Sequence, residues 1–259
     1  EGDLGFCEAY LDEWWSTPDL QAFMDLVHAG NETVYDGFPG QGLLRQFEKF
    51  RFWLQRNNRK QAKRNISYHY DLGNAFYEQW LDESMTYSAA LFESEDDTLA
   101  QAQARKYRRI CESLNLKPGD RVLEIGCGWG GFAEVAIRDF GCHVTGLTLS
   151  REQLDYARSR LESAGLGDKA DLRLQDYRDV SERFDAVASI EMFEAVGEAH
   201  WPVYFKQVHH CLKPGGRAAL QVITIREGDF ERYRNTVDFI QKYIFPGGML
   251  PPAPLLDTL

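Results

Sequence analysis

The chain has 259 residues, of which 44% are hydrophobic and 27% are charged, and its net charge is −11 at pH 7. This composition predicts a globular protein with one sizeable domain and an accessory piece. The negative charge argues against a general nucleic-acid-binding protein, because such proteins need positive surface to displace counterions. No run of about 18 apolar residues occurs, so the sequence predicts no membrane-spanning helix.

The cysteines and histidines give no indication of a metal site. Five cysteines are scattered along the chain, without a C-x-x-C pair or a Cys/His cluster at metal-ligand spacing. They predict reduced thiols in a cytoplasmic protein. His209 and His210 are adjacent and would point in different directions on a helix. Because the first residue is Glu1, we expect the chain to be a piece of a longer protein, and no targeting peptide is visible.

The N-terminal part of the chain predicts helices separated by irregular segments. Residues 1–45 combine aromatic and acidic residues with Gly/Pro punctuation at 36–42, and we interpret them as the C-terminal part of an accessory domain. Residues 46–115 are predicted to form a helical cap. Within it, an aromatic-rich, poorly periodic stretch covers 66–98, and a helix is predicted at 99–114.

Residues 116–259 predict a Rossmann-like α/β domain with a parallel sheet and helices on both faces. Short apolar runs alternate here with helical stretches, which is the pattern of β-α-β units. The runs are residues 121–126, 143–149, 170–175, 184–190 and 217–225. Ser150 and Gln153 predict a capping box after the second run. We expect residues 245–256 to form a loop, and the C-terminal strands of the domain to be missing.

The segment EIGCGWGGF at 124–132 raises the question of a cofactor. Gly126, Gly128 and Gly131 follow the spacing G-x-G-x-x-G. This match alone is a weak signal, because tight strand-to-helix turns use glycine for steric reasons. Here, however, the loop lies between the first predicted strand and a helix, where glycines let a ligand approach backbone N–H groups.

The acids around this loop distinguish between two cofactors. A nicotinamide dinucleotide requires Asp or Glu at the end of the second strand to hold the ribose hydroxyls. That strand ends in TGLTLS (145–150) without an acid, whereas Glu124 lies within the first strand and Asp176 follows the third. Carboxylates favour a cationic aminium and sulfonium. The loop therefore predicts S-adenosylmethionine.

Six blocks of sequence point to a family. They are LEIGCGWGG, VTGLTLSREQ, YHYDLGNAFYEQWLD, MTYSAALF, SIEMFEAVGE and FIQKYIFPGGMLP. Through nearly the whole chain from Gly5, the sequence resembles the cyclopropane-fatty-acid synthase family of S-adenosylmethionine-dependent methyltransferases. The resemblance implies methyl transfer to the double bond of an unsaturated phospholipid acyl chain, which closes a cyclopropane through a carbocation.

The resemblance also implies cofactor contacts. The methionine part would lie against Gly126, Gly128 and Gly130, close to Glu124, and would be covered by Tyr87 and Ser88. The ribose and the adenine would be approached by Thr148 with Gln153 and by Asp176 with Tyr177, respectively. For any single aromatic residue of this set, filling of the core is the alternative interpretation.

The implied reaction makes three demands on the protein. An alkene is a poor nucleophile, so the methyl group and the double bond must be aligned. The carbocation must be protected from water and stabilised by aromatic faces, for which the excess of aromatic residues between 68 and 92 is suited. A base must then remove a proton. Loss from the new methyl group gives a cyclopropane, and loss from a neighbouring chain carbon gives a branched alkene.

In the family this base is thought to be a bound bicarbonate held by a glutamate, a histidine, a tyrosine and backbone groups. The glutamate corresponds to Glu194, with Ile190 alongside, and Glu191 is an additional acid where many relatives have a small residue. Ala89 replaces a cysteine, Gln221 replaces the histidine, and the tyrosine would lie beyond the chain. We predict Glu194, Gln221, Ile190 and Ala89 as catalytic positions. The alternative for Glu194 is a helix N-terminal acid stabilised by the macrodipole.

These departures leave other functions open. A relative that forms methylene- or methyl-branched acyl chains with a reductase partner is one alternative. A small-molecule methyltransferase on the same scaffold is another, and a catalytically inactive lipid-binding or cofactor-binding protein is a third.

A basic helix face is predicted near the start of the cap. Its residues follow the spacing i, i+3, i+4, i+7, i+8 and are Arg56, Arg59, Lys60, Lys63 and Arg64. They would share one face of the helix and bind an anionic membrane surface, at about 1 kcal/mol per charge before screening. The alternative is a solvated helix packed on the main domain. We expect a cytoplasmic protein associated peripherally with the inner face of the membrane, and leave open whether it is a homodimer.

Overall fold

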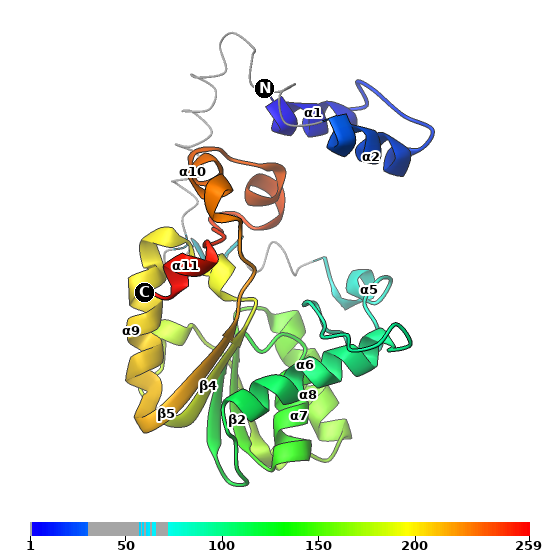
Figure 1. Cartoon of the computed structure of the whole chain (residues 1–259). Coiled ribbons are helices and arrows are strands. Elements are labelled where there is room, and N and C mark those ends of the chain that lie inside the picture. The colour runs from blue at the N-terminus through cyan, green and yellow to red at the C-terminus, as the bar shows by residue number, and fades with distance from the viewer. Residues whose placement is uncertain (1, 31–56, 58, 60, 63, 66–71) are drawn as a thin grey trace.

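The computed structural model describes residues 2–30, 57, 59, 61–62, 64–65 and 72–259 (Figure 1). A parallel sheet with flanking helices forms one end of the molecule, as predicted, and helices α1 (Gly2–Leu11) and α2 (Leu20–Gly30) lie at the other end. The described residues contain no helix that is both long and apolar enough to cross a bilayer. All five cysteines are free thiols.

The sheet has five parallel strands in the order β3-β2-β1-β4-β5. Their bounds are Arg121–Ile125 for β1, His143–Thr148 for β2, Ala170–Leu174 for β3, Phe184–Ile190 for β4 and Leu212–Gln221 for β5. The chain order reverses between β1 and β4. In open α/β sheets, ligands bind outside the carboxyl ends of the strands at such a reversal. The topology therefore directs attention to the ends of β1 and β4.

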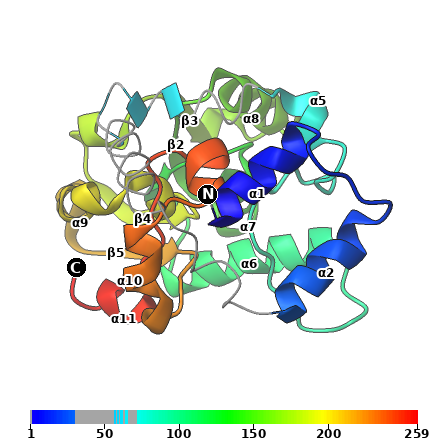
Figure 2. The ribbon, with the colours of Figure 1, turned by 90° about the horizontal axis from the view of Figure 1, so that it is seen from above.

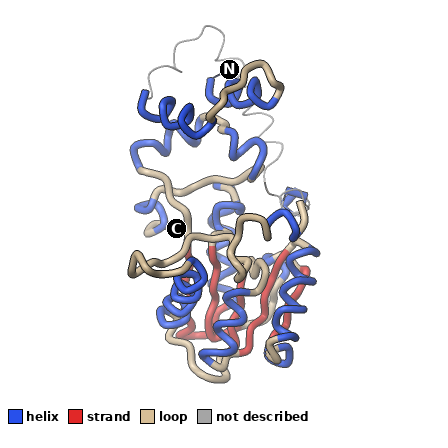
Figure 3. The backbone as a smooth tube through the Cα atoms, turned by 90° about the vertical axis from the view of Figure 1, so that its right-hand side faces the viewer, coloured by secondary structure: helices blue, strands red, loops and turns tan. Residues whose placement is uncertain are grey.

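Helices cover both faces of the sheet (Figure 3). Helices α6 (Leu99–Ser113), α7 (Gly131–Phe140) and α8 (Arg151–Ser163) pack on one face around buried Phe132. On the opposite face, α9 (Trp201–Cys211) buries its aromatic side against the sheet. The continuous apolar runs of the strands are explained by this arrangement, because a strand covered on both faces has no polar side.

Helix caps correct one prediction. Ser150 does accept a hydrogen bond from the backbone N–H of Gln153, but the reciprocal bond of a capping box is not formed. The Gln153 side chain instead accepts a hydrogen bond from Thr148, at 2.8 Å. A complete capping box opens α6, where Thr98 and Gln101 satisfy each other's backbone N–H groups. The helix predicted at 99–114 is thereby confirmed.

Two expectations about the C-terminal third were wrong. The fifth strand was predicted at 217–225, but β5 begins at Leu212 and ends at Gln221. It begins earlier because a register shift opposite β4 accommodates the KPGG turn within the strand. The chain then leaves the sheet, since the N–H of Ile223 donates to the Glu194 side chain and not to a strand. The tail predicted as a loop contains the short helix α11 (Ala253–Leu256), which begins after Pro252.

The remaining elements are short, and most of them lie on the side of the carboxyl ends of the strands, whereas η1 precedes β3 at its amino end. They are α5 (Asn74–Tyr77), α10 (Glu227–Asn235), the π-helix η5 (Ile240–Ile244) and the 3-10 helices η1 (Gly167–Lys169), η2 (Tyr177–Asp179), η3 (Phe193–Val196) and η4 (Glu198–His200). Helix α1 is joined to η5 because Glu8 accepts hydrogen bonds from Lys242 and Tyr243, each at 2.6 Å. Figure 2 views the molecule from the end at which α1 lies.

Candidate active site

A cavity of about 170 Å³ lies where the topology predicts a ligand, at the carboxyl ends of β1 and β4. Its walls come from the glycine loop, the end of β2, the residues after β3 and β4, and the segment Met85–Ser88. Several predicted site residues line it, namely Tyr87, Ser88, Glu124, Gly126, Gly128, Thr148, Gln153, Asp176, Tyr177 and Ile190. Among the described residues, no group of three or more His, Cys, Asp or Glu side chains could hold a metal ion.

The glycine loop is fixed to β2 by its backbone. The N–H groups of Gly126 and Cys127 both donate to the carbonyl oxygen of Leu147, at 3.0 and 2.8 Å. Gly126 has a φ of +87°, and a Cβ there would lie 2.9 Å from Cγ of Met192, so only glycine allows this close approach. Gly130 is absent from the cavity wall. A Cβ at this position would meet Ala157 of α8 at 3.1 Å, so Gly130 serves helix packing.

Glu124 is an acid buried at the floor of the cavity. Only 2% of its surface is exposed, and its Oε2 has no hydrogen-bond partner in the part of the chain that the structure describes. Burial raises the pKa of Glu124 to about 8, although Lys106 and Arg160 oppose the shift. A buried carboxyl group without a partner is costly unless a ligand supplies the missing donor or charge. The site therefore fits the aminium group of a methionine-derived cofactor, and Glu124 would hold that group.

The two residues predicted to approach the ribose, Thr148 and Gln153, are hydrogen-bonded to each other. Thr148 and Gln153 are both buried, and the Thr148 hydroxyl donates to Oε1 of Gln153 at 2.8 Å. This bond fixes the orientation of the Gln153 amide at the cavity wall. The backbone N–H of Ser150 donates back to the Thr148 hydroxyl at 3.1 Å, so the end of β2 and the start of α8 are held together.

The acid predicted near the adenine is already paired. Asp176 accepts two hydrogen bonds from the Arg178 guanidinium, at 2.6 and 2.8 Å. Burial raises the pKa of Asp176, but the bonds from Arg178 outweigh it and hold the pKa below its ordinary value. Asp176 therefore contributes little net negative charge to the cavity. Beside it, burial raises the pKa of Tyr177 to about 12, so its ring lies neutral on the wall.

The aromatic residues of the cap form layers behind the cavity. Between residues 72 and 92, Tyr87 lines the cavity, whereas Tyr77 is buried behind it with ring centroids 5.7 Å apart. Tyr77 also contacts the ring of Trp129, whose indole N–H donates to Asn74 at 2.7 Å. Trp80 is half-exposed. Tyr87 and Trp129 of the glycine loop thus contribute aromatic rings to the cavity wall, together with Tyr107, Tyr177 and Phe245, and their role toward a carbocation stays a prediction.

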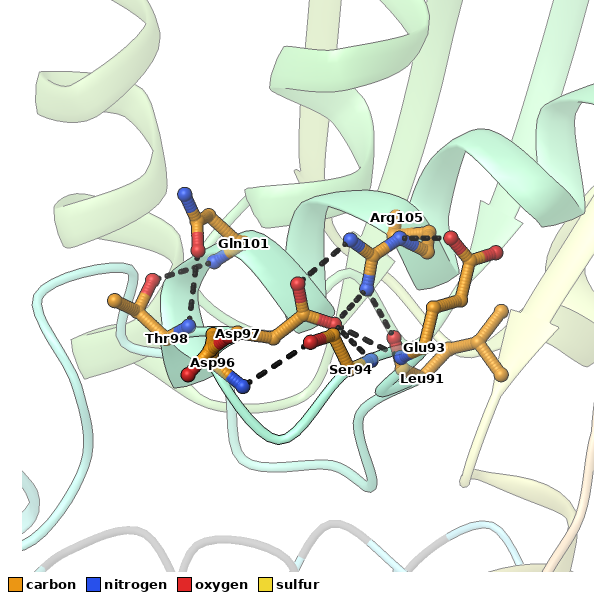
Figure 4. Close-up of polar contacts among 8 residues, drawn as sticks. All are labelled: Leu91, Glu93, Ser94, Asp96, Asp97, Thr98, Gln101 and Arg105. Atoms are coloured by element: carbon orange, nitrogen blue, oxygen red, sulfur yellow. Dashed lines mark hydrogen bonds and ion pairs between the residues drawn. The ribbon is translucent and has the colours of Figure 1, made fainter.

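A polar network holds the segment that carries Tyr87 against α6 (Figure 4). Arg105 donates to both carboxylate oxygens of Asp97, at 2.6 and 3.0 Å, and to the carbonyl oxygen of Leu91. Asp97 also accepts the backbone N–H groups of Glu93 and Ser94. Hydrogen bonds from Arg105 are the main reason why the pKa of Asp97 lies far below its ordinary value. The segment covering the cavity is therefore anchored at its C-terminal end.

Three of the residues predicted to be catalytic surround Glu191 at the end of β4. The backbone N–H of Ala89 donates to Oε1 of Glu191 at 3.0 Å, and the Gln221 amide donates to the same oxygen at 2.7 Å. Ile190 lines the cavity beside Glu191, which lines it too. Glu191 has a φ of +47°, a left-handed conformation that is uncommon for a residue with a side chain. Glu191 therefore links the cap to the sheet.

Glu194 lies behind this group, outside the cavity wall. Its side chain accepts a hydrogen bond from the N–H of Ile223, and its Oε2 is buried without a hydrogen-bond partner among residues that the structure describes. Burial raises the pKa of Glu194 to about 7, against the effect of the Ile223 N–H. Glu194 lies in the first turn of η3, and its own backbone N–H also lowers its pKa, so the interpretation as a helix N-terminal acid stays open beside the catalytic one.

The predicted basic helix is described at a few positions only. Arg59 and Arg64 are exposed, and Arg59 pairs with Asp179 at 2.7 Å. Asn57 and Asn65 point the other way: they line the cavity and each donates to the carbonyl oxygen of Pro246. The positions of the other three basic residues, Arg56, Lys60 and Lys63, are outside the described residues.

Some cavity residues were not predicted from sequence. Asn57 and Asn65 were read as part of a basic surface helix, and their contacts with the loop at Pro246 span more than 180 residues, so no local signal reveals them. A buried lysine was missed as well, although it is not part of the cavity wall: Lys106 is buried in α6, its Nζ has no hydrogen-bond partner among the described residues, and burial lowers its pKa to about 8. The sequence contains a signal for the burial of Lys106, because this residue follows Ala102 by four positions and therefore lies on the same, buried side of α6.

The sequence profile of the mycolic acid cyclopropane synthetase family matches residues 57–258. Tuberculostearic acid methyltransferase UfaA1 of Mycobacterium tuberculosis is 40% identical over 96% of this chain and 60% of its own length. The cyclopropane-fatty-acyl-phospholipid synthase of Escherichia coli is 39% identical over 97% of this chain and 63% of its own length. The chain thus spans about three-fifths of the length of these curated relatives.

A solved structure gives the same assignment. Mycolic acid cyclopropane synthase CmaA1, complexed with SAH and CTAB, superposes with a TM-score of 0.71 and 31% sequence identity, covering 76% of this chain and 72% of that one. The predicted Rossmann-like fold is confirmed by this match and by the parallel sheet. The chain belongs to the mycolic acid cyclopropane synthetase family, whose members share an S-adenosylmethionine-dependent methyltransferase fold.

Proposed function

We propose that this chain carries the active site of an enzyme that transfers a methyl group from S-adenosylmethionine to the double bond of an unsaturated phospholipid acyl chain and closes a cyclopropane ring. The observation that carries the proposal is Glu124, a buried acid beside the glycine loop whose Oε2 has no hydrogen-bond partner among the described residues. Such a group fits a cationic methyl donor and not a pyrophosphate. The Escherichia coli relative, named as a cyclopropane-fatty-acyl-phospholipid synthase, supports the lipid substrate.

The described residues divide the work of this reaction. Bound in the cavity, S-adenosylmethionine supplies an electrophilic methyl group. Glu124 holds the aminium end, and Thr148 with Gln153 holds the ribose, so that the double bond can be aligned with the methyl group. Tyr87 and Trp129 line the cavity with aromatic faces that stabilise a carbocation on the acyl chain and keep water away from it. Glu191, Gln221 and Glu194 lie at the opposite end, where a proton must leave.

Two observations favour a second function, the formation of a branched acyl chain. The relative named tuberculostearic acid methyltransferase matches this chain as well as the cyclopropane synthase does, at 40% against 39% identity. Gln221 also stands where the family resemblance expects histidine, and it bonds to Glu191. A branched acyl product, completed by a reductase, is therefore the alternative. Both products require the same methyl transfer and differ only in which proton is lost.

The proposed substrate places the protein at a membrane. We propose peripheral association with the inner, anionic face of the membrane through the exposed side chains of Arg59 and Arg64. The same region reaches the cavity through Asn57 and Asn65. Surface binding and access of the acyl chain would thus be coupled through one segment.

The test uses the full-length protein, S-adenosylmethionine with a labelled methyl group, and phospholipid vesicles with monounsaturated chains. We expect label in the acyl chains. The two candidate products have the same mass, so proton NMR must separate the high-field signals of a cyclopropane from the vinyl signals of a branched alkene. Absence of label from the lipid, with label found in a small molecule, would refute a lipid substrate.

A further inference from the structure

Glu191 already accepts hydrogen bonds at the end of the cavity where the family resemblance implies a bound anion. Two donors at this end, the backbone N–H of Ala89 and the amide of Gln221, both donate to Oε1 of Glu191. A bicarbonate ion would have to displace this carboxylate and would then lie beside its negative charge. The described residues therefore do not fit the bicarbonate that the family resemblance implies.

We propose that the carboxylate of Glu191 is itself the proton acceptor of the reaction, so that the enzyme works without a bound anion. This inference rests on the proposed function, because it concerns the last step of that reaction. Glu191 lines the cavity, and its Oε2 has no hydrogen bond among the described residues. Two donors fix one carboxylate oxygen, and the other remains available to take a proton.

The step balances without a further reactant. Methyl transfer uses the π electrons of the double bond to form a carbon–carbon bond, and the carbon–sulfur electron pair stays with sulfur. The neighbouring chain carbon is left positively charged. Glu191 then takes a proton from the new methyl group, and the electron pair of that C–H bond closes the ring. In the branched alternative, the proton comes from an adjacent chain carbon and its electron pair forms a double bond.

The backbone at Glu191 gives an independent indication of function. A φ of +47° is strained for glutamate and would be relaxed for glycine. Strained residues persist where the surrounding structure holds them, and they concentrate at functional sites. Here the N–H of Glu191 donates to the carbonyl oxygen of Gln221 at 2.8 Å, which fixes the conformation at the carboxyl end of β4.

A purely structural role is the competing explanation, since Glu191 joins the segment at Ala89 to β5 through Gln221. Two substitutions separate the roles. Glu191→Gln keeps an oxygen that can accept the same hydrogen bonds but cannot act as a base. Glu191→Gly relaxes the backbone and leaves the donors of Ala89 and Gln221 open to a small anion. Glu198→Gln is the matched control, because this nearby acid lies outside the cavity and pairs with Arg234.

The first measurement is turnover in buffer freed of carbon dioxide. We expect wild-type and Glu198→Gln proteins to be fully active without bicarbonate, and Glu191→Gln to lose about 100-fold in kcat, the lower range for a general base. S-adenosylmethionine affinity and thermal stability should stay near wild type in all variants. A wild-type enzyme that requires added bicarbonate, or a Glu191→Gln variant that keeps most of its turnover, would overturn the proposal.

The second measurement does not depend on turnover. ¹³C-labelled bicarbonate is titrated into each protein without any methyl donor, and its NMR line width is followed. Broadening is expected with Glu191→Gly and not with wild type, and bicarbonate or formate should restore part of the activity of that variant. Equal broadening with wild type would refute the claim that Glu191 fills the anion site. If wild-type protein forms no lipid product at all, the proposed function fails. The titration then still decides whether the Glu191 carboxylate or bicarbonate occupies this site.

Discussion

Two acids of the cavity wall, Glu124 and Glu191, differ in their hydrogen bonds. At the cofactor end, Glu124 is buried and none of the described residues donates a hydrogen bond to its Oε2, which leaves room for a cationic ligand. At the reaction end, Glu191 already receives hydrogen bonds from Ala89 and Gln221. We therefore expect Glu124 to bind a cationic ligand, whereas Glu191, which is already held through one carboxylate oxygen, can act as a base by itself.

The sharpest test of the cofactor end is Glu124→Gln. Loss of a charged interaction with the aminium group should weaken S-adenosylmethionine binding about 10-fold to 100-fold, since bonds to charged groups contribute about 1.5–3 kcal/mol. Because the pKa of Glu124 is raised to about 8, wild-type affinity should increase as the pH rises toward 8, with release of a proton on binding. Calorimetry in two buffers measures both effects, and the pH dependence should be weaker in the variant.

Glu194→Gln tests the reaction end without touching the cavity wall. We expect turnover to fall about tenfold, below the usual range for a group in direct contact with the proton, while cofactor affinity stays unchanged.

The stability of this variant provides a second readout. The folded-state pKa of Glu194, about 7, lies above the ordinary value of 4.5. The folded protein therefore binds this proton more tightly than the unfolded chain, and this stabilisation is complete below pH 4.5 and is lost as the pH rises to about 7. The melting temperature of Glu194→Gln relative to wild type should thus increase between pH 5 and pH 8. A constant difference would contradict the shifted pKa.

Trp129→Phe tests whether residues 74–88, which cover the cavity, are held in place through Trp129. The variant keeps an aromatic face but loses the hydrogen bond to Asn74, which contributes about 1 kcal/mol. Hydrogen exchange should become faster in residues 74–88, and cofactor affinity should fall about fivefold if the cover opens to that extent. Trp14→Phe is the control, because Trp14 is 79% exposed. Equal exchange rates would show that α5 is not held through Trp129.

The smallest effect is expected at the surface. Replacing Arg59 and Arg64 together by glutamine should reduce binding to anionic vesicles about threefold, below the limit of about 1 kcal/mol per charge, because Asp179 partly neutralises Arg59 and salt screens both. Sedimentation with vesicles measures the change. The control is Arg109→Gln with Arg151→Gln, which removes two exposed charges from α6 and α8. An equal loss in the control would indicate attraction without a defined surface.

Local patterns predicted much of the α/β domain. The strands β1 to β4 and the helix α6 lie where apolar runs and periodicity predicted them. A strand that is buried on both faces appears as a run of consecutive apolar residues, so it can be recognised locally. The glycine loop and Glu124 were found for the same reason. Strand β5 was misplaced because its bulge depends on its pairing with β4. The capping box at Ser150 was wrong because Thr148 competes for the Gln153 side chain.

The sequence by itself determined the parallel sheet, the glycine turn and the acid beneath it, since these follow from short-range spacing and from residue chemistry. Only the tertiary structure decided which acid meets which donor. Ala89 and Gln221 come from segments more than 100 residues apart in the chain, and they meet on Glu191 because β4 and β5 are neighbours and the cap folds over their ends. Contacts of this kind depend on the path of the whole chain, which no local pattern records.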